Sequence, residues 1–269
     1  MLRMIISRKW ILATVLVLAA MAVMARLGIW QLDRLKTRRA FNARVTAEMA
    51  APVLDLRDGA PQADLIQMEY RTVTVSGVYD PQGEIALRNQ VWNDQWGVHL
   101  ITPLKIAGSD QAILVDRGWI PGVDYQAGNW SQYDESGKVT VRGVIRLSEN
   151  KAELGRRSDP TPVPGAGPLK TWNFVNIPRL QEQISEPLLP VYIQQAPAQG
   201  WQGLPYRSQP ELDLSEGPHL SYAVQWFMFA TILGIGYPFY IHRQESRREK
   251  GQTLNQRDRE VTQGSTKSI

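Results

Sequence analysis

Two long runs of apolar residues, one near each end of the chain, dominate the hydrophobic pattern. The first covers residues 10–25 and continues beyond Arg26 through residues 27–30. The second covers residues 217–241 and contains no Asp, Glu, Lys or Arg. At a rise of roughly 1.5 Å per residue, a run of about 20 residues can cross a hydrocarbon core of about 30 Å as a helix. The pattern therefore predicts transmembrane helices at residues 10–30 and 217–241.

The chain between the two runs changes character twice. Residues 31–50 are rich in helix formers and lack Pro, so they predict a polar helix that continues the first span. Short runs rich in Val, Ile, Thr and aromatic residues follow, separated by Gly, Pro, Asn and Asp. The strands that these runs predict, about seven in number, lie at residues 70–79, 84–87, 97–106, 112–120, 138–145, 172–177 and 189–193.

The spacing of these strands predicts how they pair. No helix-length pattern lies between them to serve as a parallel crossover, so we expect a mostly antiparallel sheet. The Pro- and Gly-rich segment at residues 155–170 is expected to be irregular. The predicted fold class is therefore a membrane α+β protein, in which two transmembrane helices flank a mostly antiparallel β domain.

Charged residues beside the apolar runs predict the orientation in the membrane. Arg243, Arg247, Arg248 and Lys250 follow the second run, and basic flanks stay in the cytoplasm. The first run is basic on both sides, but an even number of spans places both termini on one side. We therefore expect cytoplasmic ends at residues 1–9 and 242–269 and an extracytoplasmic domain at residues 31–216. The membrane would be the cell inner membrane or, in a eukaryote, the mitochondrial inner membrane.

A cleaved signal peptide is the alternative interpretation of the first run. Val23-Met24-Ala25 has the small-residue spacing of a cleavage site, and cleavage there would leave a single C-terminal span. The helical pattern continues past this point, however, and ends at Trp30, a residue typical of the membrane interface. These features favour an uncleaved anchor.

Composition narrows the functional classes. The mean hydropathy over 269 residues is −0.29, so the hydrophobic residues are concentrated in a few places and the chain is not built mainly of transmembrane segments. The net charge of +4 and the pI of about 9.3 come from basic residues at the two ends, a placement that fits membrane lipid and not nucleic acid. The absence of Cys excludes disulfides, thiolate metal sites and a Cys nucleophile.

The sequence offers no catalytic constellation. His99, His219 and His242 fall in a predicted strand, at the outer end of the second span and in the polar tail, without metal-motif spacing. No nucleophile and base pair can be assembled around them. We therefore predict no catalytic residue, and a membrane enzyme would need a site that the sequence does not provide.

Two stretches carry candidate chemistry of another kind. Residues 116–119, Asp-Arg-Gly-Trp, end an apolar strand and fit either a structural ion pair under an aromatic side chain or an Arg presented to a partner's carboxylate. In the second span, helical spacing places His219, Tyr222, Ala223 and Trp226 along one stripe. Taken alone, His219 fits an anchor in the headgroup layer.

Three marks occur in order along the chain. Residues 27–36 read LGIWQLDRLK, residues 97–104 and 113–121 read GVHLITPL and ILVDRGWIP, and residues 218–227 read PHLSYAVQWF. In this order and with this two-span layout, the sequence resembles the Surfeit-locus family of cytochrome c oxidase assembly factors over nearly its whole length. The motif residues that carry the resemblance are Gly28, Trp30, Gln31, Arg34, Arg117, Gly118 and Trp119.

The resemblance implies an assembly factor, not an enzyme, that assists haem a delivery or retention at the haem-bearing subunit of the oxidase. It implies haem a as the candidate cofactor, with His219 as ligand to the haem iron, Trp226 as packing support and no other metal. The implied partners are the haem-bearing subunit and haem a synthase. The alternative is a membrane-anchored structural adaptor of respiratory complex assembly that binds no haem.

Overall fold

The computed structural model describes residues 7–58, 62–128, 130–149, 159 and 167–266. The chain divides into two compact units, unit 1 (Met1–Asn42 with Leu214–Ile269) and unit 2 (Ala43–Asp213). The segment at residues 155–170, predicted to be irregular, lies largely outside the described residues. So do residues 1–6 and 267–269 of the two predicted cytoplasmic ends.

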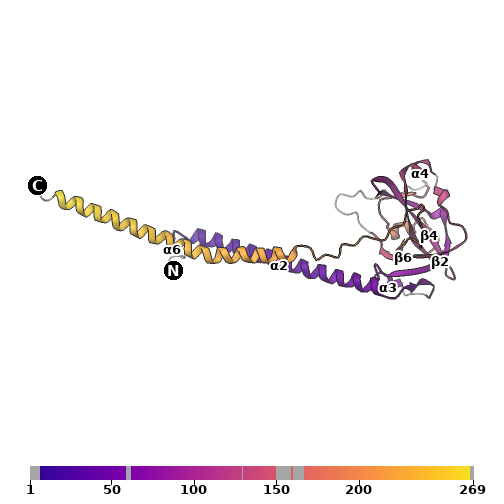
Figure 1. The fold of residues 1–269 in the computed structure, drawn as a ribbon, viewed down its shortest axis with the longest axis horizontal. Helices are drawn as coiled ribbons and strands as arrows, with labels where there is room; N and C mark the ends of the chain where they lie inside the picture. The colour runs from indigo at the N-terminus through magenta and orange to yellow at the C-terminus, as the bar shows by residue number, and fades with distance from the viewer. Residues whose placement is uncertain (1–6, 59–61, 129, 150–158, 160–166, 267–269) are drawn as a thin grey trace. The chain divides into compact units, whose positions relative to one another are not determined.

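Unit 1 is a pair of long helices that lie side by side, α2 (Ile11–Ala50) and α6 (His219–Thr266) (Figure 1). Helix α2 runs without a break through the predicted end of the span at residue 30, and its last residues, from Ala43 on, belong to unit 2. Helix α6 contains Pro238 and continues past residue 241. Both helices, α6 over His219–Thr253, are long and apolar enough to cross a membrane, and they are the membrane anchors of the chain.

The two helices pack in antiparallel register. The hydroxyl groups of Thr14 and Tyr237 are hydrogen-bonded at 2.8 Å, and Trp10 Nε1 donates to Glu245 Oε1 at 2.7 Å. A Cβ added to Gly234 would lie 2.8 Å from Met21 Cε. Gly234 therefore leaves room for the Met21 side chain between the two helices.

Unit 2 contains one eight-stranded sheet in the order β1-β2-β6-β8-β5-β4-β3-β7. Its strands are β1 (Leu54–Asp55), β2 (Thr72–Tyr79), β3 (Ile85–Trp92), β4 (Gln95–Ile106), β5 (Ala112–Pro121), β6 (Lys138–Leu147), β7 (Thr171–Trp172) and β8 (Leu188–Gln195). An additional antiparallel pairing of β2 with β4 closes strands β2, β6, β8, β5 and β4 into a barrel. Most pairs are antiparallel, as predicted, whereas β1–β2, β3–β7 and β5–β8 are parallel.

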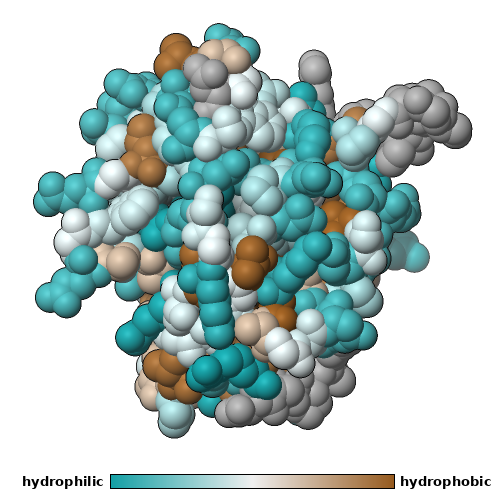
Figure 2. Space-filling view, turned by 90° about the vertical axis from the view of Figure 1, so that its right-hand side faces the viewer, coloured by the Kyte–Doolittle hydropathy of each residue, from teal (hydrophilic) through white to brown (hydrophobic). Residues whose placement is uncertain are grey.

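Buried apolar residues of unit 2 form three clusters, and alternation along the strands separates the two larger ones. Val75, Leu104, Val115, Val141 and Ile193, one from each barrel strand, belong to the cluster that fills the barrel interior. The neighbouring residues on β4, β5 and β8 point the other way and join a second cluster. That cluster contains Ile101, Leu114, Tyr192, Trp172, Val175, Ile177, Leu180 and Ile184. Figure 2 shows that the surface of this unit is mostly hydrophilic on one face, with small scattered hydrophobic patches.

The short helical elements lie between the strands. They are η1 (Leu56–Asp58), α3 (Gln62–Leu65), η2 (Pro81–Gly83), α4 (Gly122–Ala127), η3 (Trp130–Tyr133) and α5 (Ile177–Gln181).

Each of the seven predicted strands overlaps an observed strand, but the prediction for residues 172–177 is largely wrong. Only Thr171–Trp172 is extended in the sheet, and Ile177 begins helix α5. Asn176 caps this helix, because its side chain accepts a hydrogen bond from the backbone of Arg179. Phe174 and Val175 are nevertheless buried. Their burial explains why the apolar pattern resembled that of a strand.

Candidate functional site

In unit 1 the helix pair brings together the first and third sequence motifs, which are far apart in the chain. Gln31 lies on α2 and His219 is the first residue of α6, and His219 Nδ1 is 2.9 Å from Gln31 Oε1. An amide oxygen can only accept a hydrogen bond, so Nδ1 carries the proton. In the neutral form of the ring, the lone pair is then on Nε2. Gln31 thus fixes the tautomer in which Nε2 can bind a metal.

Close packing surrounds this pair. Gly28 is buried, and a Cβ added there would lie 2.7 Å from the Phe227 ring. Ala223, one turn beyond His219, is also buried. Trp226 is half-buried and meets Phe229 edge-on, with ring centroids 6.2 Å apart. The predicted stripe of α6 is therefore the side that contains buried and half-buried residues, except for Tyr222, which is exposed.

The other residues of the first motif lie elsewhere on α2. Trp30 and Arg34 are exposed, and the Arg34 guanidinium carbon lies 5.9 Å from the centre of the Trp30 ring. One motif therefore holds residues of two kinds. Gly28 and Gln31 contact α6, whereas Trp30 and Arg34 face the surroundings.

Polar side chains of α2 also hold the segment that precedes α6. Arg39 binds both carboxylate oxygens of Glu216 at 2.8 Å, and Arg38 Nε donates to the Ser215 carbonyl at 3.0 Å. Asn42 Nδ2 donates to the Leu214 carbonyl at 2.5 Å. The entry of α6, and with it His219, is thus fixed by several contacts to α2.

In unit 2 the second motif forms a buried network of charges. Arg117 on β5 is only 1% exposed, and its Nη1 donates to Glu84 Oε2 at 3.0 Å. Its Nη2 donates to the Tyr133 carbonyl and, at 3.3 Å, to Glu135. The guanidinium also lies 4.9 Å from the centre of the Tyr79 ring. Arg117 therefore has carboxylate and carbonyl partners within the domain, as the structural interpretation of this motif requires.

A second arginine shares this network. Arg207 Nη2 donates to Glu135 Oε1 at 2.6 Å, and Arg207 Nε donates to the Arg117 carbonyl at 3.4 Å. Burial raises the pKa of Glu84, although hydrogen bonds from Thr102 and Arg117 and the charge of Arg117 oppose that rise. Two arginines and two glutamates thus neutralise each other inside the domain, the condition under which buried charges are tolerated.

Asp116 does not pair with Arg117, because successive residues of a strand point to opposite faces. It binds His99 on β4, whose Nδ1 lies 2.9 Å from both carboxylate oxygens. Burial of His99 disfavours its charged form, but the charge and hydrogen bond of Asp116 prevail and raise the His99 pKa. The ion pair that the sequence indicated within residues 116–119 is therefore two separate pairs.

Gly118 and Trp119 complete the motif by joining β5 to the chain at Tyr206. Gly118 has φ +118°, and a Cβ there would collide with the Tyr206 carbonyl oxygen. Trp119 is buried, its backbone forms a bridge with Tyr206, and its ring centroid lies 5.3 Å from that of Trp92. Among the described residues, Trp119 Nε1 has no hydrogen-bond partner. The contacts are those of a domain core.

Sequence reasoning missed the partners Glu84, Glu135, Arg207 and the role of His99. His99 did carry a signal, because it is a polar residue within a run of apolar residues that indicates a buried strand, and Glu84 stands directly before such a run. Glu135 and Arg207 lie in loops and carried none.

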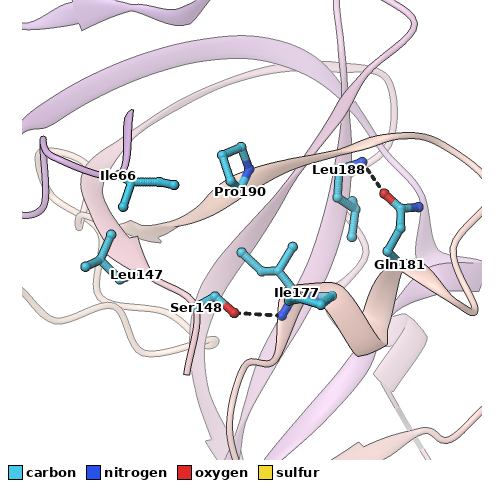
Figure 3. A pocket seen from close by; sticks show the side chains of 8 residues that line it. Ile66, Leu147, Ser148, Ile177, Gln181, Leu188 and Pro190 are labelled. Atoms are coloured by element: carbon cyan, nitrogen blue, oxygen red, sulfur yellow. Dashed lines mark hydrogen bonds between the residues drawn. The ribbon is translucent and has the colours of Figure 1, made fainter. Parts of the chain in front are cut away.

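Unit 2 also contains an apolar cavity of about 550 Å³ (Figure 3). Ile66, Leu147, Ile177, Leu188 and Pro190 are among its lining residues. Its two polar side chains serve the backbone: Ser148 Oγ accepts from Ile177 N at 3.0 Å, and Gln181 Oε1 accepts from Leu188 N at 2.6 Å. The cavity therefore offers apolar surface and little directional chemistry. Among the described residues, no three His, Asp or Glu side chains are grouped to hold a metal ion.

Comparison with known proteins places the chain among relatives of one kind. Residues 18–231 match the model of the SURF1 family. A SURF1-like protein of Rickettsia bellii is 27% identical over 246 residues, which cover 86% of this chain and 91% of the relative. SURF1-like proteins of Caenorhabditis briggsae and Monosiga brevicollis are 21% and 26% identical, over 83% and 77% of this chain and 74% and 78% of theirs.

Proposed function

Because this chain belongs to the SURF1 family, known in general as a family of cytochrome oxidase assembly factors and not of enzymes, we propose that it assists the handling of haem a during oxidase assembly. The haem is cargo that the protein delivers to, or retains at, the haem-bearing subunit. That subunit is the proposed partner, with haem a synthase as the proposed donor and membrane lipid around the helix pair.

The observation that carries the haem role is the contact between His219 and Gln31. A hydrogen bond of 2.9 Å to an amide oxygen fixes the proton on Nδ1, so Nε2 is the electron-pair donor of the ring. Haem iron accepts such a nitrogen as an axial ligand. Trp226, half-buried two turns further along α6, supplies apolar aromatic surface on the same stripe.

The spectrum of the purified protein tests this role. The full chain would be produced in a host that makes haem a, purified in detergent and examined for a Soret band and a haem a pyridine spectrum. We expect His219→Ala to abolish or strongly shift the spectrum while the protein still accumulates, and Trp226→Leu to weaken haem retention less. Unchanged haem content in His219→Ala would eliminate the ligand role.

Gln31 gives a second measurement on the same site. Gln31→Leu removes the acceptor that fixes the imidazole, and loss of such a partner typically weakens metal binding roughly 10- to 100-fold. Gln31→Glu keeps an acceptor and should retain haem. Thr37→Ala is the matched control, because Thr37 is exposed on the same helix and bonds only within it, to the Asp33 carbonyl.

We also propose that both termini are cytoplasmic and that the β domain lies outside the cytoplasm. The basic residues after the second span and the even number of spans support this orientation. Alkaline phosphatase fused near Gly137 should be active, and the same reporter fused after Arg248 should be inactive. The reverse pattern would contradict the proposed topology.

A structural adaptor without haem is the second candidate function. The same His219–Gln31 contact supports it, since a hydrogen bond between two helices can serve only to hold them together. In that case His219→Ala would loosen the helix pair and lower oxidase levels, although the purified wild-type protein would show no haem spectrum.

A further inference from the structure

The hairpin of β3 and β4 in unit 2 exposes apolar side chains on both of its flanks. Val91 and Trp96 are directly opposite each other in the ladder and are 67% and 45% exposed. Trp92 lies on the other face of the strand, stacked on Tyr206 yet 36% exposed. Val123 at the start of α4 is 70% exposed, next to Gly122, against which Trp96 packs. We call Val91, Trp92, Trp96 and Val123 the hairpin patch.

A tight turn and aromatic contacts hold the hairpin in place. Its two-residue loop, Asn93 and Asp94, has φ values of +50° and +60°, the positive pair that a tight type I′ turn requires. Trp96 meets Tyr125 edge-on at 5.9 Å, and Trp92 meets Trp119 at 5.3 Å, so both indole rings are held in place. Exposed aromatic rings that are already ordered lose little entropy on binding. Such side chains dominate protein interfaces.

The distribution of polarity indicates what covers the patch. The outermost residues of the hairpin are Asn93 and Asp94, so entry into a bilayer by the tip would bury a carboxylate before either indole ring. From residue 89 to residue 104, and throughout α4, the sequence contains no Lys or Arg that could meet anionic headgroups. The apolar surface lies on the two flanks of the hairpin. A cleft in a protein can contact both flanks at once, whereas the surface of a bilayer can contact only one of them.

We propose that the hairpin patch docks into an apolar cleft of a protein partner that presents a cation or hydrogen-bond donor to Asp94. Given the proposed assembly function, on which this inference rests, that protein is the haem-bearing subunit of the oxidase. The side chains on the two flanks of the hairpin fill the cleft, and the contact of Asp94 fixes the position of the hairpin within it.

Photo-crosslinking in native membranes tests the contact. A photoreactive amino acid would replace Val91 or Val123 in the full chain, and Val78 in the control, since Val78 is also an exposed valine of the barrel, at 47%. We expect an adduct that contains the haem-bearing subunit from positions 91 and 123, and not from position 78. An adduct of phospholipid mass, or no adduct at all, would overturn the proposal.

Substitutions test whether oxidase assembly depends on the docking of the hairpin patch. Val91→Glu and Asp94→Lys should each lower the crosslinking yield from position 123 and the haem a content of assembled oxidase roughly tenfold, whereas Val78→Glu should leave both unchanged. Asp94→Lys alters no apolar contact, so it still decides the question if Val91→Glu fails to accumulate. Normal assembly with Asp94→Lys would contradict the docking role. Deletion of the whole chain is the separate control, because unchanged oxidase after deletion would instead refute the proposed assembly function.

Discussion

The helix pair of unit 1 and the barrel of unit 2 handle polar groups in opposite ways. Between α2 and α6 the polar contacts are few and gather towards the two ends of the apolar spans, at Trp10 and Glu245 and at Gln31 and His219. In the barrel, Arg117, Glu84 and Arg207 are buried in the interior of the domain. Lipid cannot satisfy a polar group, so a membrane pair keeps such groups to the ends or bonds them across the helices. A folded domain can bury a charge where several strands supply its partners.

The two paired histidines show the same contrast. His219 meets a neutral amide, which selects a tautomer and adds no charge, whereas His99 meets a carboxylate, which stabilises the charged ring. The first arrangement links the two helices and places the ring proton on Nδ1, and the second holds two strands of the barrel together. The two histidines thus differ in their chemistry because one contacts an amide and the other a carboxylate.

Removal of the buried cation should have the largest effect. Arg117→Ala leaves the buried Glu84 without its arginine partner, whereas Glu135 keeps Arg207. The stranded carboxylate should cost roughly 3–5 kcal/mol of unfolding free energy. We expect much less protein in membranes and a lower Tm in detergent. Arg57→Ala, which breaks an exposed pair with Asp55, is the control and should change little. Normal accumulation of Arg117→Ala without functional oxidase would point instead to a direct contact with a partner.

The close approach of the helices should be the next most sensitive feature. Gly28→Leu places a side chain where the Phe227 ring now lies, and such overpacking typically costs about 1–3 kcal/mol. Because the chain has no Cys, a disulfide between cysteines introduced at Met21 and Gly234 would report helix association without background. We expect Gly28→Leu to reduce its yield. Gly236→Ala should not, since nothing lies within 4 Å of a Cβ there; equal yields would show that the helices do not pack at Gly28.

The His99–Asp116 pair predicts a pH dependence confined to the barrel. The folded pKa of His99 is raised, so the charged pair stabilises the domain fully below the unfolded pKa of about 6.5. That contribution is lost as the pH rises through the folded pKa. Thermal unfolding of the full chain should therefore show a fall in Tm above about pH 6.5 that is smaller in His99→Gln. The same fall in both proteins would assign it to other groups.

The exposed pair of Arg39 and Glu216 should matter least. Both side chains are about half exposed, so water screens their attraction despite the two short hydrogen bonds. Arg39→Ala should leave the disulfide yield and the abundance almost unchanged. A large loss of either would show that this pair, and not the packing at Gly28, sets the entry of α6.

The sequence by itself determined the two spans, the continuous helix to Ala50, the β domain between them and the family. These follow from local composition and periodicity, which helices and alternating strands impose directly on neighbouring residues. The stripe of His219, Ala223 and Trp226 could also be predicted from the sequence, because a period of 3.6 residues places all three on one side of a helix.

Only the tertiary structure decided which side chains meet. Nothing local indicates that His219 pairs with Gln31, that Arg117 meets Glu84 and Asp116 meets His99, or that β2 and β4 close the barrel. Such partners are chosen by strand register and helix packing over the whole chain. Residues 172–177 show that a local pattern can also mislead. Their apolar residues are buried, as in a strand, but Asn176 caps a helix that begins at Ile177.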